Sequence, residues 1–206
     1  SKLDYYWFTS GTPTYLIEML KKFQVMPSEI GSCEADKSEF DAPTEGMSSV
    51  MPLLYQSGYI TIKGYDPATE LYTLDIPNKE IRVGLYRSLL PNYIGMNTVK
   101  GTTTIAKMSA LIRRNDMDGA MQMLQAYLAT VPYCNNADSE GHYQQMMYVI
   151  FSILDNYVDV EVRTPSGRVD MVLRTATHLY LFELKLNKDA DAAMKQINLK
   201  EYPKRF

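Results

Sequence analysis

The sequence predicts a protein of class α+β or α/β, with an N-terminal module of residues 1–95 and a C-terminal module of residues 96–206. Apolar residues recur at helical spacing in several segments, which predicts amphipathic helices. Two alternating segments in the first module predict a β-hairpin, and three apolar segments near the C-terminus predict strands. With 46% hydrophobic and 22% charged residues, the 206-residue chain has the composition of a globular protein.

Charge, cysteine content and hydropathy exclude several classes of protein. The net charge of -3 gives no overall attraction to nucleic acid. Cys33 and Cys134 lie too far apart for metal-ligand spacing, so we expect free thiols in a reducing cytoplasm. No apolar run approaches the roughly 20 residues that span a bilayer. We therefore expect a cytoplasmic protein without membrane contact.

The N-terminal module is predicted to run helix, helix, hairpin, helix, an order typical of a small winged-helix-like domain. Thr12 and Asn78 are expected to cap the first and last of these helices. Asp66 and Pro67 mark the hairpin turn. The expected helices cover residues 13–23, 45–58 and 79–94, the strands 59–65 and 70–76, and a loop with a short helix 27–44.

The charge of this module argues against DNA binding. Residues 1–95 carry eight Lys and Arg against twelve Asp and Glu, a net charge of 8 - 12 = -4. The helix before the hairpin, where a recognition helix would lie, contains no Lys or Arg. Because phosphate contacts need cations, a packing or regulatory module is favoured over a DNA-binding one.

The C-terminal module begins after a boundary near residues 96–101. Asp116 is expected to cap its second helix, and Glu140 opens its third. The expected helices cover residues 102–114, 116–130, 140–156 and 189–201, and the strands 157–163, 168–174 and 178–186.

Three charged residues interrupt the last two of these strands. Glu183 and Lys185 share a strand face because residues two apart point the same way. The strand is apolar on both sides of them, which predicts burial by helices on both faces. Adjacent strands would place Asp170 beside Glu183, and two buried carboxylates repel unless a cation lies between them. Oxygen ligands with open positions suit Mg²⁺.

A structural interpretation of the same residues is also open. Glu183 and Lys185 can form an ion pair with no further role, with Asp170 solvated at a strand end.

The order of elements and motifs resembles the PD-(D/E)XK nuclease superfamily. The resemblance rests on "EVRTPSGRVDMVL", "LYLFELKL" and "AMKQINLKEY", in which Val169-Asp170 replaces the usual Pro-Asp. More closely, these segments resemble the nuclease domain at the C-terminus of bacterial AAA-ATPase-like proteins common in Bacteroidetes. Residues 5–20 and 53–77 are similar to the segment that links ATPase and nuclease in that family.

The resemblance implies a restriction-endonuclease-like αβββα core that stops before its last strand. It implies a metal-dependent nuclease that hydrolyses nucleic-acid phosphodiester bonds, with DNA as the expected substrate and Mg²⁺ or Mn²⁺ as the cofactor. The site residues that it implies are Asp170, Glu183 and the Leu184 carbonyl as metal ligands, Lys185 as the catalytic lysine, Glu140 as a further acidic residue with Glu161 as its competitor, and Gln196 on the last helix.

Three further points bear on function. No GxxxxGK(S/T) sequence occurs, so the ATPase domain is expected to be a partner missing from this chain. The alternative function is a non-catalytic protein-interaction or regulatory module that keeps the nuclease fold. A sequence-specific DNA binder acting through the winged helix is a third possibility.

Overall fold

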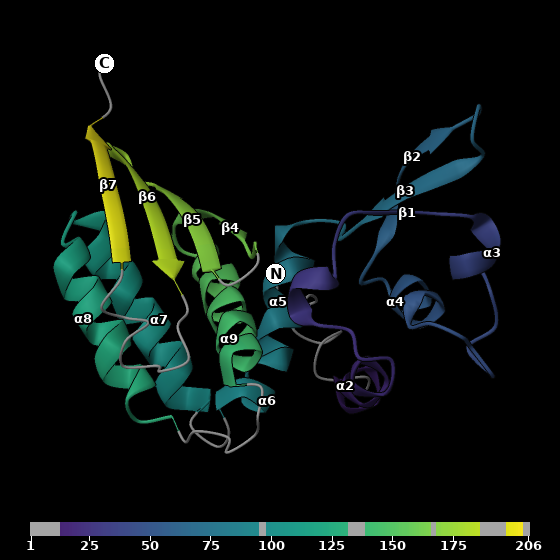
Figure 1. Ribbon diagram of the computed structural model, residues 1–206, viewed down its shortest axis with the longest axis horizontal. Coiled ribbons are helices and arrows are strands. Elements are labelled where there is room, and N and C mark those ends of the chain that lie inside the picture. The colour runs from purple at the N-terminus through teal and green to yellow at the C-terminus, as the bar shows by residue number, and fades with distance from the viewer. Residues whose placement is uncertain (1–12, 95–97, 132–138, 166–167, 186–196, 204–206) are drawn as a thin grey trace. The chain divides into compact units, whose positions relative to one another are not determined.

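The chain folds into two compact units that mix helices with antiparallel sheets, Ser1–Leu89 and Leu90–Phe206. The sequence analysis placed the change of module a few residues later, after residue 95. The computed structural model describes residues 13–94, 98–131, 139–165, 168–185 and 197–203 (Figure 1).

The N-terminal unit holds a three-stranded antiparallel sheet of order β1-β3-β2. Its elements are α2 (Pro13–Lys22), η1 (Pro27–Glu29), β1 (Cys33–Ala35), α3 (Lys37–Phe40), α4 (Met51–Gln56), β2 (Thr61–Asp66), β3 (Leu71–Asp75) and α5 (Lys79–Leu89). The predicted hairpin is confirmed as β2 and β3, whose turn is held by a 2.9 Å bond from the Ala68 N–H to Asp66 Oδ1. The segment 27–44, predicted as a loop with a short helix, also contains β1, whose three residues are too few to show alternation.

Proline positions explain where two helices of this region differ from the prediction. Pro52 lies in the first turn of α4, where its missing N–H costs nothing, so the helix begins at Met51 and not near residue 45. Pro91 separates α5 from a short helix α6 (Pro91–Ile94). The cap by Asn78 is confirmed by a 2.9 Å bond from the Ile81 N–H to its Oδ1. The predicted cap Thr12 lies outside the described residues.

The C-terminal unit combines helices with a four-stranded sheet. Besides α6, its elements are α7 (Thr98–Arg113), α8 (Met117–Leu128), α9 (Ser139–Leu154), β4 (Asp159–Arg163), β5 (Arg168–Arg174), β6 (His178–Lys185) and β7 (Ile197–Pro203). The predicted cap Asp116 is confirmed, because its Oδ1 accepts the Gly119 N–H at 2.9 Å.

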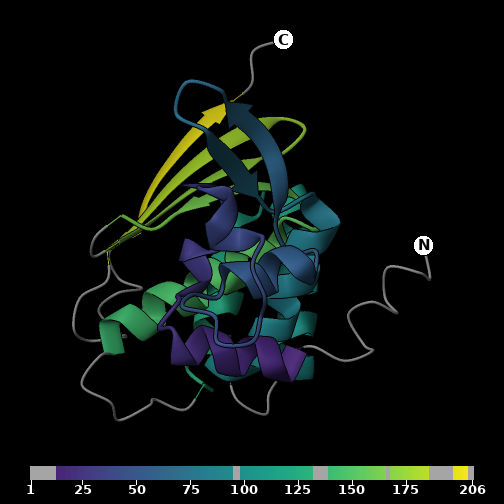
Figure 2. The ribbon, with the colours of Figure 1, turned by 90° about the vertical axis from the view of Figure 1, so that its right-hand side faces the viewer.

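The sheet of this unit is antiparallel throughout, with strand order β4-β5-β6-β7. Figures 1 and 2 show α7, α8 and α9 together on one side of it. The buried face carries Val160, Val162, Val169, Met171, Leu173, Tyr180, Phe182 and Leu184. Burying each such side chain contributes about 1.5–3 kcal/mol, so this face supplies much of the core.

The expectation that β5 and β6 are buried on both faces is wrong. Buried and half-exposed residues alternate along both strands, and Asp170, Val172, Leu181 and Glu183 are on the half-exposed side. A single apolar layer below an antiparallel sheet accounts for this pattern. The wrong prediction arose because the half-exposed face also carries apolar residues, among them Val172 and Leu181.

The predicted final helix over residues 189–201 is wrong where the structure describes it. Residues 197–201 belong to β7, which pairs with β6 from Leu184↔Ile197 to His178↔Pro203. The part from 189 to 196 lies outside the described residues. The sheet therefore has a fourth strand, contrary to the prediction that the chain stops before one. Pairing satisfies the backbone groups that β6 would otherwise expose at a sheet edge.

The turn between α7 and α8 is tied to the turn between β5 and β6 by Asn115. Its Oδ1 accepts bonds from Tyr180 Oη at 3.0 Å and Thr175 Oγ1 at 3.2 Å, and its Nδ2 donates to Thr177 Oγ1 at 3.0 Å. Asn115 has a φ of 59°, a left-handed conformation that Asn tolerates better than most residues. One side chain thus joins the helical layer to the sheet.

Replacing Asn115 tests this junction. Asn115→Ala should lower the free energy of unfolding by about 2–4 kcal/mol, because hydrogen bonds are lost and alanine is strained at positive φ. Asn115→Gly loses the same bonds but not the backbone conformation, so it should be about 1 kcal/mol more stable than Asn115→Ala. Urea unfolding measures both, and equal stability of the two variants would contradict the backbone part of the explanation.

Candidate functional site

The register of β5 against β6 brings the two predicted carboxylates together. Asp170 lies directly opposite Glu183, and residues so paired share a sheet face with Cβ atoms about 5 Å apart. The predicted adjacency of these two residues is therefore confirmed. They lie on the face turned away from the helices, which we call the charged face: Asp159, Glu161, Arg163, Arg168, Asp170, Val172, Arg174, Leu179, Leu181 and Glu183.

Two basic residues flank this carboxylate pair. Arg168 lies opposite Lys185, one same-face position along from Asp170 and Glu183 on each strand. The backbone therefore sets a row of two bases beside a row of two acids. Of Lys185, the structure describes the backbone only, so the position of its ammonium group stays a prediction.

The carboxylate of Asp170 is incompletely satisfied. Arg168 Nε lies 3.2 Å from Asp170 Oδ1, and the Asp170 side chain is 34% exposed. Oδ1 itself is shielded from solvent and accepts no hydrogen bond from any described residue. The arginine contact thus supplies opposite charge without the geometry of a hydrogen bond. A buried acceptor left in this state is costly, and an additional cation would satisfy it.

Glu161, the predicted competitor of Glu140 for the further acidic role, already accepts hydrogen bonds from two arginines. Its Oε1 accepts a 2.9 Å bond from Arg163 Nη2, and its Oε2 a 3.4 Å bond from Arg174 Nη2. The bond from Arg163, followed by that from Arg174, lowers the pKa of Glu161 below its usual value of 4.5. Arg174 also lies 3.5 Å from Asp159. These four residues satisfy one another, which distinguishes Glu161 from Asp170.

Glu140 lies in the first turn of α9, and the structure describes its backbone but not its side chain. Gln144, one turn later, falls on the same helix face. Gln144 Nε2 donates to the carbonyls of Pro165 and Arg168, at 2.8 Å each. The sequence analysis missed Gln144, although an amide four residues after Glu140 was a usable signal. This face of α9 is therefore anchored to the chain that enters β5.

Of the two remaining predicted residues, the structure describes Leu184 but not Gln196. Leu184 lies between Val169 of β5 and Ile197 of β7, with its side chain buried on the helix-covered face. Gln196 lies outside the described residues.

The residues present fit a divalent cation in part. Within the described segments, no three His, Cys, Asp or Glu residues gather as a metal-binding group. Asp170 and Glu183 supply two carboxylates, and Oδ1 of Asp170, which accepts no hydrogen bond from the described residues, has a free position for a cation beside Arg168. Few carboxylate ligands with open positions suit Mg²⁺, which keeps several waters.

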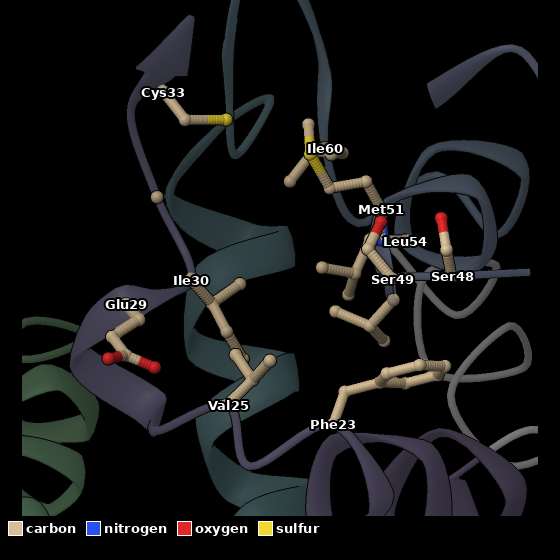
Figure 3. Close-up of a pocket in the computed structure, with 12 residues that line it drawn as sticks. Phe23, Val25, Glu29, Ile30, Cys33, Ser48, Ser49, Met51, Leu54 and Ile60 are labelled. Atoms are coloured by element: carbon tan, nitrogen blue, oxygen red, sulfur yellow. Dashed lines mark hydrogen bonds between the residues drawn. The ribbon is translucent and has the colours of Figure 1, made fainter. Parts of the chain in front are cut away.

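A separate cavity of about 300 Å³ lies in the N-terminal unit. Figure 3 shows Phe23, Val25, Ile30, Met51 and Leu54 around it, with the Cys33 thiol at one end. Burial, and then the charges of Asp75 and Glu39, raise the pKa of Cys33. The thiol therefore stays protonated at neutral pH and is a poor nucleophile. Nothing in this lining suggests catalysis.

Comparison with known proteins finds a match over the C-terminal third of the chain, which includes the strands of the charged face. Residues 138–206 match the family model of the PD-(D/E)XK nuclease superfamily. That match includes α9, all four strands and every predicted site residue. An uncharacterized protein from the vnfD 5′ region of Azotobacter chroococcum mcd 1 is 31% identical over 210 residues. The alignment covers 98% of this chain and 40% of that relative, so the chain spans well under half of the relative's length.

No solved structure matches the chain. Within the described residues, no helix has the length and apolar character required to cross a membrane.

The pKa of Glu161 gives a test of the arginine network. Because this pKa is lowered in the folded protein, Glu161 stabilises the fold above pH 4.5, and this contribution is lost as pH falls through the folded value. Glu161→Gln should therefore flatten the fall of the urea midpoint below pH 4.5. Glu34→Gln in the N-terminal unit controls for the loss of one exposed carboxylate. If the urea midpoint of Glu161→Gln falls below pH 4.5 as steeply as that of the wild type, the stabilising role of the network is contradicted.

Proposed function

We propose that the C-terminal unit is a metal-dependent nuclease that hydrolyses phosphodiester bonds in nucleic acid, with DNA as the expected substrate. The observation that carries the proposal is the pairing of Asp170 with Glu183 on the charged face, where Asp170 Oδ1 accepts no hydrogen bond from any described side chain or backbone group. The match to a nuclease superfamily over the same residues supports it. A cytoplasmic location is part of the proposal.

The carboxylates are proposed to hold Mg²⁺ or Mn²⁺. Asp170 and Glu183 would provide oxygen ligands from neighbouring strands, with the Leu184 carbonyl between them in sequence as a third. Glu140 would add an acidic group from α9, whose face is fixed by the bonds of Gln144. Glu161 is a poorer candidate because two arginines already bind it. When bound, the cation would offset negative charge on the scissile phosphate.

The other proposed residues act on the substrate. Lys185 would place its ammonium beside the phosphate, where it orients the attacking water or stabilises developing charge. Gln196 would steady the site or contact the nucleic-acid backbone. The four-stranded sheet supports these roles by fixing the Cα positions of Asp170, Glu183 and Lys185 in one register.

The N-terminal unit is proposed to be a winged-helix-like module that contacts protein. Its order of helix, short 3-10 helix, strand, helix, helix, strand, strand and helix, together with its sheet order β1-β3-β2, supports the winged-helix comparison. Helix α4 has no Lys or Arg, which argues against a DNA-reading role. The proposed partner is an AAA-type ATPase domain, on the basis of the sequence resemblance. The greater length of the Azotobacter relative leaves room for such a domain.

A non-catalytic interaction module is the alternative function. The Arg168–Asp170 contact favours it, because a carboxylate held by arginine needs no metal to be stable at a surface.

Cation binding separates these two functions. Asp170→Asn keeps the shape of the side chain but removes its charge, so it should weaken Mg²⁺ or Mn²⁺ binding at least tenfold, a loss of about 1.4 kcal/mol. Asp159→Asn, which changes an exposed carboxylate on the same face, should bind the cation as the wild type does. Isothermal titration calorimetry measures both, and Glu161→Gln shows whether Glu161 contributes. A wild-type protein that binds neither ion would reject the metal-dependent nuclease.

Lys185→Met tests whether the lysine acts in catalysis. Methionine keeps most of the apolar stem and removes the charge, so the variant should fold, bind metal and fail to cleave DNA. If Lys185 is only the structural partner of a buried Glu183, the variant should lose on the order of 3–5 kcal/mol of stability without metal. Melting temperature and cleavage rate, each with and without Mg²⁺, distinguish the outcomes. Cleavage at the wild-type rate would remove Lys185 from the mechanism.

A further inference from the structure

We propose that Arg168 is an exchangeable counter-ion: it neutralises Asp170 when no divalent cation is bound, and it turns to a substrate phosphate when one is. This inference rests on the proposed nuclease function and assigns a positioning role to a residue outside the predicted ligand set. Arg168 would couple cation binding to nucleic-acid binding.

The contact between Arg168 and Asp170 is suited to exchange. Nε of Arg168 lies 3.2 Å from Asp170 Oδ1, yet this oxygen accepts no hydrogen bond from the described residues. Glu161, by contrast, accepts directed bonds from two arginine Nη2 atoms. Arg168 therefore holds Asp170 by charge more than by hydrogen bonding. Such a contact is easily replaced by a metal ion, which binds carboxylate oxygen directly.

The backbone of Arg168 is fixed while its guanidinium group is accessible. Its N–H donates to the Pro165 carbonyl at 3.1 Å, and its own carbonyl accepts the 2.8 Å bond from Gln144 Nε2. Its side chain is 44% exposed. Rotation about the side-chain torsions can therefore move the guanidinium without disturbing the start of β5. The Cα position keeps the group within reach of the carboxylate row.

Electrostatics determine the direction of the movement. A divalent cation at Asp170 Oδ1 would repel the guanidinium group from that oxygen. Arginine presents a planar set of N–H donors that matches phosphate oxygens, so a phosphodiester is a suitable new partner. Arg163 and Arg174 are held on Glu161 and Asp159 and would not be released by the same event. Among the arginines of the charged face, Arg168 is the one that the cation would displace.

Two affinities that move in opposite directions test the proposal. Arg168→Gln removes a competing positive charge, so Mn²⁺ should bind roughly threefold more tightly by calorimetry, the size expected for an exposed ion pair. With Mn²⁺ bound, the same variant should bind a short phosphorothioate DNA duplex more weakly, with its salt slope reduced by about one. Without metal, the slope should match that of the wild type, because Arg168 is then held by Asp170.

Control variants separate this role from a structural one. Arg174→Gln removes an equal charge from the same strand and should change neither Mn²⁺ affinity nor the metal-dependent salt slope. Arg168→Lys restores the charge and should return Mn²⁺ affinity to near the wild-type value.

The same measurements distinguish a failure of the counter-ion proposal from a failure of the nuclease proposal. If the wild type binds Mn²⁺ and cleaves DNA but Arg168→Gln shows wild-type Mn²⁺ affinity or an unchanged salt slope, Arg168 is not an exchangeable counter-ion and the nuclease stands. If the wild type binds no divalent cation, both the nuclease and the counter-ion are overturned. Melting temperatures confirm that each variant is folded.

Discussion

The register of β5 against β6 determines which side chains of the C-terminal unit face the helices and which face outward. Since side chains alternate along a strand, a slip of one residue would carry Asp170 and Glu183 into the apolar layer and Val169 and Leu184 out of it. The burial of that layer against α7, α8 and α9 therefore holds the carboxylates in place. Core packing and site geometry have the same physical origin here.

The charged face shows two ways of satisfying a carboxylate. Asp159 and Glu161 share two arginines in a network that leaves little demand for another ligand. Asp170 has the positive charge of Arg168 nearby, but its Oδ1 accepts no hydrogen bond within the described part of the chain. Both arrangements count as ion pairs by distance alone. They differ in hydrogen-bond geometry and burial, and this difference is why the proposed cation is assigned to Asp170 and not to Glu161.

The two units have different electrostatic character, which bears on how a nuclease of this kind would work. The N-terminal unit carries more acidic than basic residues, and its helix α4 has no cationic side chain to meet phosphate. Under the proposed function, substrate contacts would fall to the C-terminal unit, through side chains such as Arg168 that a carboxylate neutralises in the absence of a cation. Such an arrangement would let a nearly neutral module meet a polyanion without a permanently basic surface.

The sequence alone determined the type of most elements other than β1 and β7, the caps at Asn78 and Asp116, and the proximity of Asp170 to Glu183, because these follow from local periodicity and adjacent strands. It could not determine β7 or the single-sided burial of the sheet, since residues 197–201 satisfy a helical pattern as readily as a strand until β6 offers an edge to pair with. Nor could it give the partners of the Gln144 side chain, or the contact between Arg168 and Asp170. Those depend on which backbone carbonyls and carboxylates distant segments bring within about 3 Å, a distance set by packing and not by spacing along the chain.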